Sequence, residues 1–163
     1  MKDDLKYQLV GKHLADTNKE LFNTLLQQVG YEEPVMFDYD KIPALVEPFC
    51  KTLEITKAEM IGKLYDRDAT RYKNYFTAVV VKLYCPLVLN NPNLRLPNGL
   101  MAAIGRALGV FGRKKLGFLR MSLFYYGIYD DWRAIVDELY NIIVKHNNEQ
   151  RNQELSGQPE SMD

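Results

Sequence analysis

Acidic side chains are absent from a long central part of this chain. Between Ala69 and Tyr129, 61 consecutive residues contain no aspartate or glutamate, while nine arginines and lysines give them a formal charge of +9. The residues before this acid-free segment carry nine basic and 13 acidic side chains, and those after it carry three and eight. The net charge of +0 therefore hides a basic middle between two acidic ends, which bears on binding partners and not on fold.

Cysteine and long apolar runs are also scarce. Cys50 and Cys85 belong to no paired motif, so we expect two reduced thiols and no disulfide framework. The longest apolar run, residues 76–89, contains Lys82 and Pro86 and is too short to cross a bilayer. The chain opens with a charged amphipathic pattern and not with a secretory leader. These absences predict a cytoplasmic protein with no membrane partner.

The residue patterns of common enzymes are missing too. None of the three serines lies in a nucleophile elbow, neither histidine has a partner at metal-ligand spacing, and no glycine-rich dinucleotide fingerprint occurs. Residues 109–115 contain glycines and lysines without the spacing of a phosphate-binding loop. We therefore expect no enzyme, metal, cofactor or small-molecule substrate, although a carboxylate site assembled from distant residues stays open.

Apolar residues at helical spacing dominate what is present. They predict an all-α protein, with a compact bundle of about six or seven helices in a single domain over residues 1–146 and a disordered polar tail over 147–163. Near the start, Thr17 and Glu20 have capping-box spacing, which predicts two helices broken near Asp16. From Asn147 onward the chain is polar and the last helix is expected to have ended near His146.

The middle of the chain gives sharper boundaries. Thr56 and Glu59 form a second capping box, and Asp68 is the expected cap of the next helix. That helix covers residues 72–84, where a β-branched run makes a strand the competing interpretation. We expect the helix that contains Trp132 to pack across this helix and across the one that follows residue 112.

Residues 101–110 read MAAIGRALGV and carry a resemblance. This segment resembles the first helix and turn of helix-turn-helix DNA-binding domains, which carry an apolar residue, a small residue, and then a glycine followed by an apolar residue. The matching residues are Ile104, Gly105, Leu108, Gly109 and Val110. The resemblance implies a helix-turn-helix-like unit near residues 100–126. The second helix departs from the pattern, because Lys115 occupies a position where an apolar residue is expected. Alternatively, residues 99–115 form one longer helix.

A helix that begins near Gly112 would hold three cations in its first turn. A helix N-terminus attracts phosphate, so such a cluster favours an anionic ligand. The predicted phosphate-contacting residues are Arg106, Arg113, Lys114, Lys115 and Arg120, with Arg71 and Lys73 extending the patch. These residues predict a double-stranded DNA-binding regulator or accessory factor.

The alternative is a protein that binds protein. The acid-free segment of a non-enzymatic helical interaction module would meet an acidic partner, or a homodimer would cover it with acidic segments of the second subunit. Both predictions depend on where the cations lie. DNA binding requires the arginines and lysines to face outward together on one side of the folded molecule, whereas internal neutralisation would leave only a helical scaffold.

Overall fold

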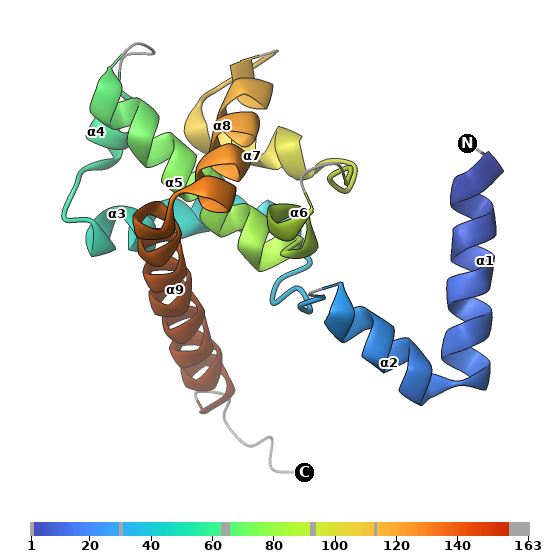
Figure 1. Cartoon of the computed structure of the whole chain (residues 1–163). Helices are drawn as coiled ribbons and strands as arrows, with labels where there is room; N and C mark the ends of the chain where they lie inside the picture. Colours follow the sequence, from blue (N-terminus) through green and yellow to red (C-terminus); the bar gives the residue numbers. More distant parts are fainter. Residues whose placement is uncertain (1, 30, 63–65, 92–93, 113, 157–163) are drawn as a thin grey trace. The chain divides into compact units, whose positions relative to one another are not determined.

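The fold consists of helices. The computed structural model describes residues 2–29, 31–62, 66–91, 94–112 and 114–156, and gives the backbone alone at 2–6, 114–116, 150–151 and 153–156. These described residues form nine α-helices, one 3-10 helix and no strand, which confirms the all-α class (Figure 1). Some helices, such as α4 (Lys57–Ile61) and α6 (Leu87–Asn90), are too short to show a helical period of apolar residues. The sequence therefore predicted only six or seven helices.

The chain divides into two compact units. Unit 1 is Met1–Glu33 and unit 2 is Pro34–Asp163. Unit 1 contains α1 (Lys2–Thr17) and α2 (Lys19–Gln28). Unit 2 contains the 3-10 helix η1 (Tyr39–Leu45), then α3 (Val46–Thr52), α4, α5 (Arg67–Tyr84), α6, α7 (Leu100–Leu108), α8 (Lys114–Ile128) and α9 (Asp130–Ser156).

The predicted break between the first two helices is confirmed, but its cap is Asn18. The Asn18 side-chain oxygen accepts a hydrogen bond from the Leu21 amide at 3.1 Å. The predicted capping box of Thr17 is therefore wrong. Thr17 is still helical, and its hydroxyl donates to the His13 carbonyl at 2.6 Å, so it is not available to cap the next helix.

Helix α5 lies at the centre of unit 2. It contacts α4, α6, α7, α8 and α9, and 12 of its 18 residues are buried, so the helix and not the competing strand forms here. Asp66 caps it by accepting from the amides of Asp68 and Ala69, at 2.9 and 3.3 Å. The prediction that Asp68 caps this helix is therefore wrong. Asp68 lies in the first turn of α5, where its negative charge interacts favourably with the helix dipole.

The hydrophobic core surrounds α5. Phe76 of α5 meets the Phe49 ring of α3 edge-on at 5.2 Å, and the buried apolar residues extend from Ile42 to Ile143. Helix α9 packs against both α5 and α8, as predicted for the helix of Trp132. This packing brings one face of α5 opposite side chains from α8 and α9.

Helix α9 is longer than expected. It ends at Ser156, well beyond His146, because the polar residues that follow His146 include good helix formers such as glutamate, glutamine and arginine. Residues 147–156 of the predicted disordered tail are therefore helical, and its remaining residues, 157–163, lie outside the described part of the chain. Among the described residues no helix combines the length and the apolar character that a membrane crossing requires.

Candidate functional site

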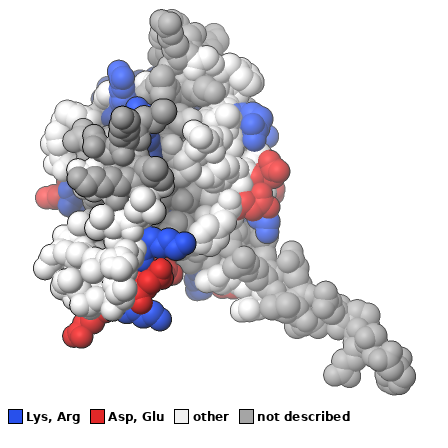
Figure 2. All heavy atoms as spheres, turned by 90° about the vertical axis from the view of Figure 1, so that its right-hand side faces the viewer, with Lys and Arg blue, Asp and Glu red and all other residues white. Residues whose placement is uncertain are grey.

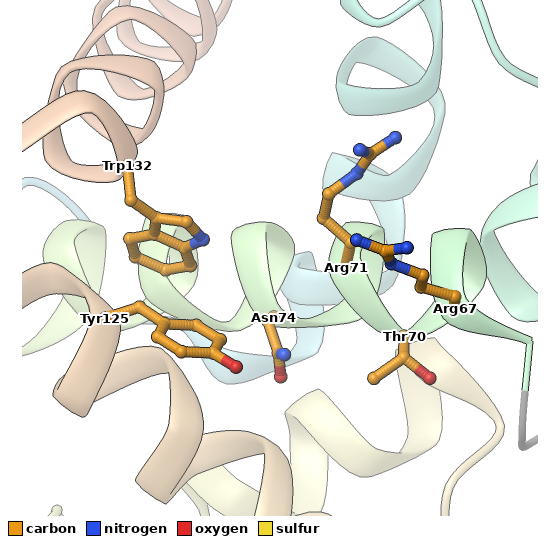
Figure 3. Close-up of a pocket in the computed structure, with 6 residues that line it drawn as sticks. All are labelled: Arg67, Thr70, Arg71, Asn74, Tyr125 and Trp132. Carbon is orange, nitrogen blue, oxygen red and sulfur yellow. The ribbon is translucent and has the colours of Figure 1, made fainter. Parts of the chain in front are cut away.

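A pocket of about 330 Å³ lies where α5, α8 and α9 meet (Figure 3). One wall is a single face of α5, because residues at spacings of three, four and seven share a helix face. The opposite wall consists of one aromatic side chain from α8 and one from α9. The lining residues are Arg67, Thr70, Arg71 and Asn74 of α5, with Tyr125 of α8 and Trp132 of α9.

Asn74 is the most unusual residue of the pocket. Its side chain is only 4% exposed, and its Oδ1 atom has no hydrogen-bond partner among the described residues. Figure 3 shows the amide between the aromatic side chains on one side and the arginines on the other. A buried acceptor without a partner costs about 1–3 kcal/mol, so its retention needs an explanation.

Two arginines stand one turn apart at the exposed end of the pocket. Arg67 is exposed and makes no ion pair or hydrogen bond within the described part of the chain. Arg71 lies 3.1 Å from the Asp68 carboxylate and 5.3 Å from the centre of the Tyr72 ring, and hydrogen bonding to Tyr72 raises its pKa. An exposed ion pair such as that with Asp68 is weak, so it leaves Arg71 able to bind another anion.

The aromatic wall is held in place by packing. Trp132 is 8% exposed, and its ring lies 5.0 Å from the Tyr75 ring and 5.8 Å from the Tyr125 ring, between ring centres. The indole nitrogen and the Tyr125 hydroxyl are on the sides of their rings that face Asn74 (Figure 3). The buried Ser122 hydroxyl donates a hydrogen bond of 2.9 Å to the backbone carbonyl oxygen of Asn74. This bond fixes α8 against α5 beneath the pocket.

Of the two predicted site residues on α5, the structure brings one to this pocket. Arg71 lines it, whereas Lys73 is 1% exposed and lies 6.0 Å from the centre of the Phe118 ring. Residues two positions apart in an α-helix are rotated by about 200° about the helix axis, so the side chains of Arg71 and Lys73 point in nearly opposite directions. Burial lowers the pKa of Lys73, and this ammonium does not reach the surface with Arg71.

Arg106 and Arg120 are the predicted cations of α7 and α8 whose side chains are described, and neither lines the pocket with Arg71. Arg106 is exposed and lies 3.9 Å from the Asp40 carboxylate, and Arg120 is exposed on α8. Arg113 lies outside the described residues, and at Lys114 and Lys115 only the backbone is described. On the face drawn in Figure 2, lysines and arginines form separate groups, some with aspartate or glutamate beside them.

The described side chains of α8 form an exposed apolar strip next to Arg120. Met121, Phe124 and Ile128 are exposed by 39%, 50% and 57%, and their spacing places them on one side of the helix. A shallow hollow of about 350 Å³ next to them is lined by Arg120, Leu123, Phe124, Gly127 and Ile128. The opposite side of α8 is buried at Leu123 and Tyr126.

Five of the six lining residues were not predicted as site residues: Arg67, Thr70, Asn74, Tyr125 and Trp132. One signal was present: polar residues recur at Arg67, Thr70, Arg71 and Asn74 on a helix that is otherwise apolar toward its C-terminus. The described residues contain no group of three histidine, cysteine or carboxylate side chains arranged to hold a metal ion. Comparison of the chain with protein families, with curated proteins and with solved structures finds no match.

Proposed function

We propose that this protein binds nucleic acid at the pocket of α5, α8 and α9. One observation carries the proposal: Arg67 and Arg71 stand at the rim of a pocket whose far wall is Tyr125 and Trp132. Guanidinium groups bind phosphate oxygens through paired hydrogen bonds, and aromatic side chains cover bases. Cations and aromatic rings in one place therefore suit a strand that offers both phosphates and bases.

The pocket favours single-stranded over double-stranded nucleic acid. The sequence predicted double-stranded DNA as the ligand and a helix-turn-helix-like unit. The order of the helices supports that unit, because α7 ends before Gly109, whose φ is 64°, and α8 begins at Lys114. Among the described side chains of α8, however, the exposed side carries Met121, Phe124 and Ile128 and a single arginine, Arg120, which suits a recognition helix poorly. Aromatic pockets take unpaired bases, so we propose single-stranded DNA or RNA as the ligand of a regulator or accessory factor.

Fluorescence anisotropy with labelled single-stranded and duplex 20-mers tests this proposal. We expect the single strand to bind more tightly, and its affinity to fall as salt rises, because phosphate contacts release counterions. The double variant Arg67→Glu with Arg71→Glu should abolish binding. Arg95→Glu, at an exposed arginine of the loop before α7, is the matched control and should keep most of the affinity. Unchanged binding by the double variant would refute the site.

A second candidate is the homodimer, which the apolar strip of α8 favours. Exposed apolar patches mark protein interfaces, and the acid-free segment of one copy complements the acidic segments of another. In that case the mass measured by sedimentation rises with protein concentration, Phe124→Ser with Ile128→Ser keeps the protein monomeric, and added oligonucleotide changes neither result. A constant monomer mass over the concentration range would exclude this candidate.

A further inference from the structure

We infer that the pocket holds one nucleotide, with its phosphate on Arg67 and Arg71 and the polar edge of its base on the Asn74 amide. The juxtaposition that supports this is a buried asparagine, whose Oδ1 has no partner among the described residues, between two exposed guanidinium groups and an aromatic wall (Figure 3). The inference rests on the proposed function for its ligand class and adds to it which part of the nucleic acid is read.

The size of the pocket limits its occupant. About 330 Å³ lies at the lower end of the roughly 300–1,000 Å³ that small-molecule pockets span. A ring system with one attached phosphate suits such a volume, whereas a base pair of a duplex is too large to enter it. The occupant is therefore either a free mononucleotide or an unpaired nucleotide of a strand, which share the same chemistry.

Asn74 distinguishes a nucleotide from a simple anion. Its orphaned Oδ1 needs a hydrogen-bond donor, and at neutral pH a phosphate bound through its oxygens to two arginines keeps only one or two O–H donors. The edge of a base offers an N–H donor beside an acceptor, and the asparagine amide presents an acceptor beside a donor. A base can satisfy the buried oxygen while its attached phosphate stays on the arginines, whereas an inorganic phosphate held by the arginines presents no N–H to Asn74.

The remaining lining groups supply donors for the oxygen-rich part of a nucleotide. The hydroxyls of Thr70 and Tyr125 and the indole N–H of Trp132 add to the guanidinium groups of the two arginines. Trp132 is already packed on Tyr75 and Tyr125, so this wall loses little conformational freedom when a ligand enters. The pocket is preorganised on its aromatic side and adaptable on its cationic side.

Calorimetric titration of the full chain tests the inference. The ligands are inorganic phosphate, the four ribonucleoside monophosphates, a single-stranded 12-mer, and the same 12-mer with its bases replaced by abasic residues. We expect at least one monophosphate to bind about tenfold more tightly than inorganic phosphate, the difference that one good hydrogen bond to the base supplies. We also expect the abasic strand to lose a similar factor.

Asn74→Leu is the decisive variant. Replacing a buried polar group that has no partner by an apolar group of similar size should leave the melting temperature of the free protein unchanged or higher. The same change should weaken nucleotide binding about tenfold. If this variant fails to fold, Asn74→Asp replaces it, since a carboxylate beside the arginines repels the phosphate. Arg95→Ala serves as the control for surface charge.

The outcomes separate the inference from the proposed function. Equal binding of intact and abasic strands, with no effect of Asn74→Leu, overturns the one-nucleotide pocket and leaves nucleic-acid binding standing. Binding of a monophosphate but not of the 12-mer supports the pocket and overturns nucleic-acid binding. Inorganic phosphate that binds as tightly as the nucleotides, or an absence of binding by all of these ligands, overturns the inference.

Discussion

The Lys82 ammonium lies 2.7 Å from a carboxylate oxygen of Asp137, in an ion pair that joins α5 to α9. The Tyr126 hydroxyl donates to the same oxygen at 2.9 Å, so α8 takes part as well. Lys82 also lies 4.9 Å from the centre of the Tyr140 ring. One cation of the acid-free segment is thus neutralised by a carboxylate from the acidic end of the chain.

Asp137→Asn tests what this ion pair contributes. The change leaves the half-buried Lys82 without a counter-charge and weakens its hydrogen bond, so we expect the free energy of unfolding to fall by about 1–2 kcal/mol. Urea denaturation measures the difference. Glu138→Gln, at the exposed neighbouring residue, should change the free energy of unfolding by less than about 0.5 kcal/mol. Equal effects of the two substitutions would contradict a specific role for the pair.

Tyr84 should make the protein sensitive to alkaline pH. Burial, and then the nearby Asp38 and Tyr39, raise its pKa to about 12, while its hydroxyl donates to the Asp38 carbonyl at 2.8 Å. A tyrosine in the unfolded chain has a pKa of about 10. Because the pKa of Tyr84 is higher in the folded protein than in the unfolded chain, its contribution to the free energy of unfolding is complete below pH 10. As the pH rises toward 12, the free energy of unfolding should fall by about 3 kcal/mol.

Tyr84→Phe is the matching variant for that pH dependence. It removes one hydrogen bond, so the free energy of unfolding at neutral pH should fall by about 1 kcal/mol. It also removes the titrating group, so the decline between pH 10 and pH 12 should become shallower than in the unmodified chain. Parallel stability curves for the two proteins over this range would show that Tyr84 is not responsible.

Two glycines should respond in opposite directions to alanine. A Cβ at Gly117, inside α8, has no described atom within 4 Å, so Gly117→Ala should stabilise the helix by about 1 kcal/mol. A Cβ at Gly62 would lie 2.8 Å from the Ala69 Cβ and 3.0 Å from the Glu59 carbonyl oxygen. Gly62→Ala should therefore cost about 1–3 kcal/mol through overpacking. Thermal denaturation distinguishes the two, and shifts of the same sign would contradict this prediction.

Removal of residues 1–33 should leave unit 2 folded. All buried core residues of the described chain lie between Ile42 and Ile143, so the deletion takes none of them away. We expect the melting temperature of residues 34–163 to stay within about 3 °C of that of the full chain, which for a domain of this size corresponds to less than about 1 kcal/mol. A loss of cooperative unfolding after the deletion would show that unit 1 supports the core.

Features set by neighbours in the sequence were predictable. The Thr56 capping box is confirmed, because the Thr56 hydroxyl accepts from the Glu59 amide at 3.1 Å while the Glu59 carboxylate accepts from the Thr56 amide at 2.6 Å. The turn glycine after α7 is confirmed at Gly109, so the alternative of one helix over residues 99–115 is wrong. Both features depend on groups within a few residues of each other.

Features decided by distant residues were not predictable in the same way. Periodicity identified α5 as a helix, but not that Lys73 would be buried against Phe118 of α8 while Arg71 stays exposed. The pocket depends on α8 and α9 docking opposite Asn74, which a pattern along the chain does not specify. Where two capping residues compete, as at Asp66 and Asp68, the choice depends on which residue first leaves the helical conformation.

Because the pocket takes its walls from three helices, it exists only while those helices are docked. An unfolded chain separates the six lining side chains and has no site to offer, so any molecule that fills the pocket is bound by the folded protein alone. Folding and occupancy are then thermodynamically linked, and a ligand at one hundred times its dissociation constant adds about 2.7 kcal/mol to the free energy of unfolding. A ligand of the pocket should therefore be detectable as a rise in the melting temperature that grows with its concentration.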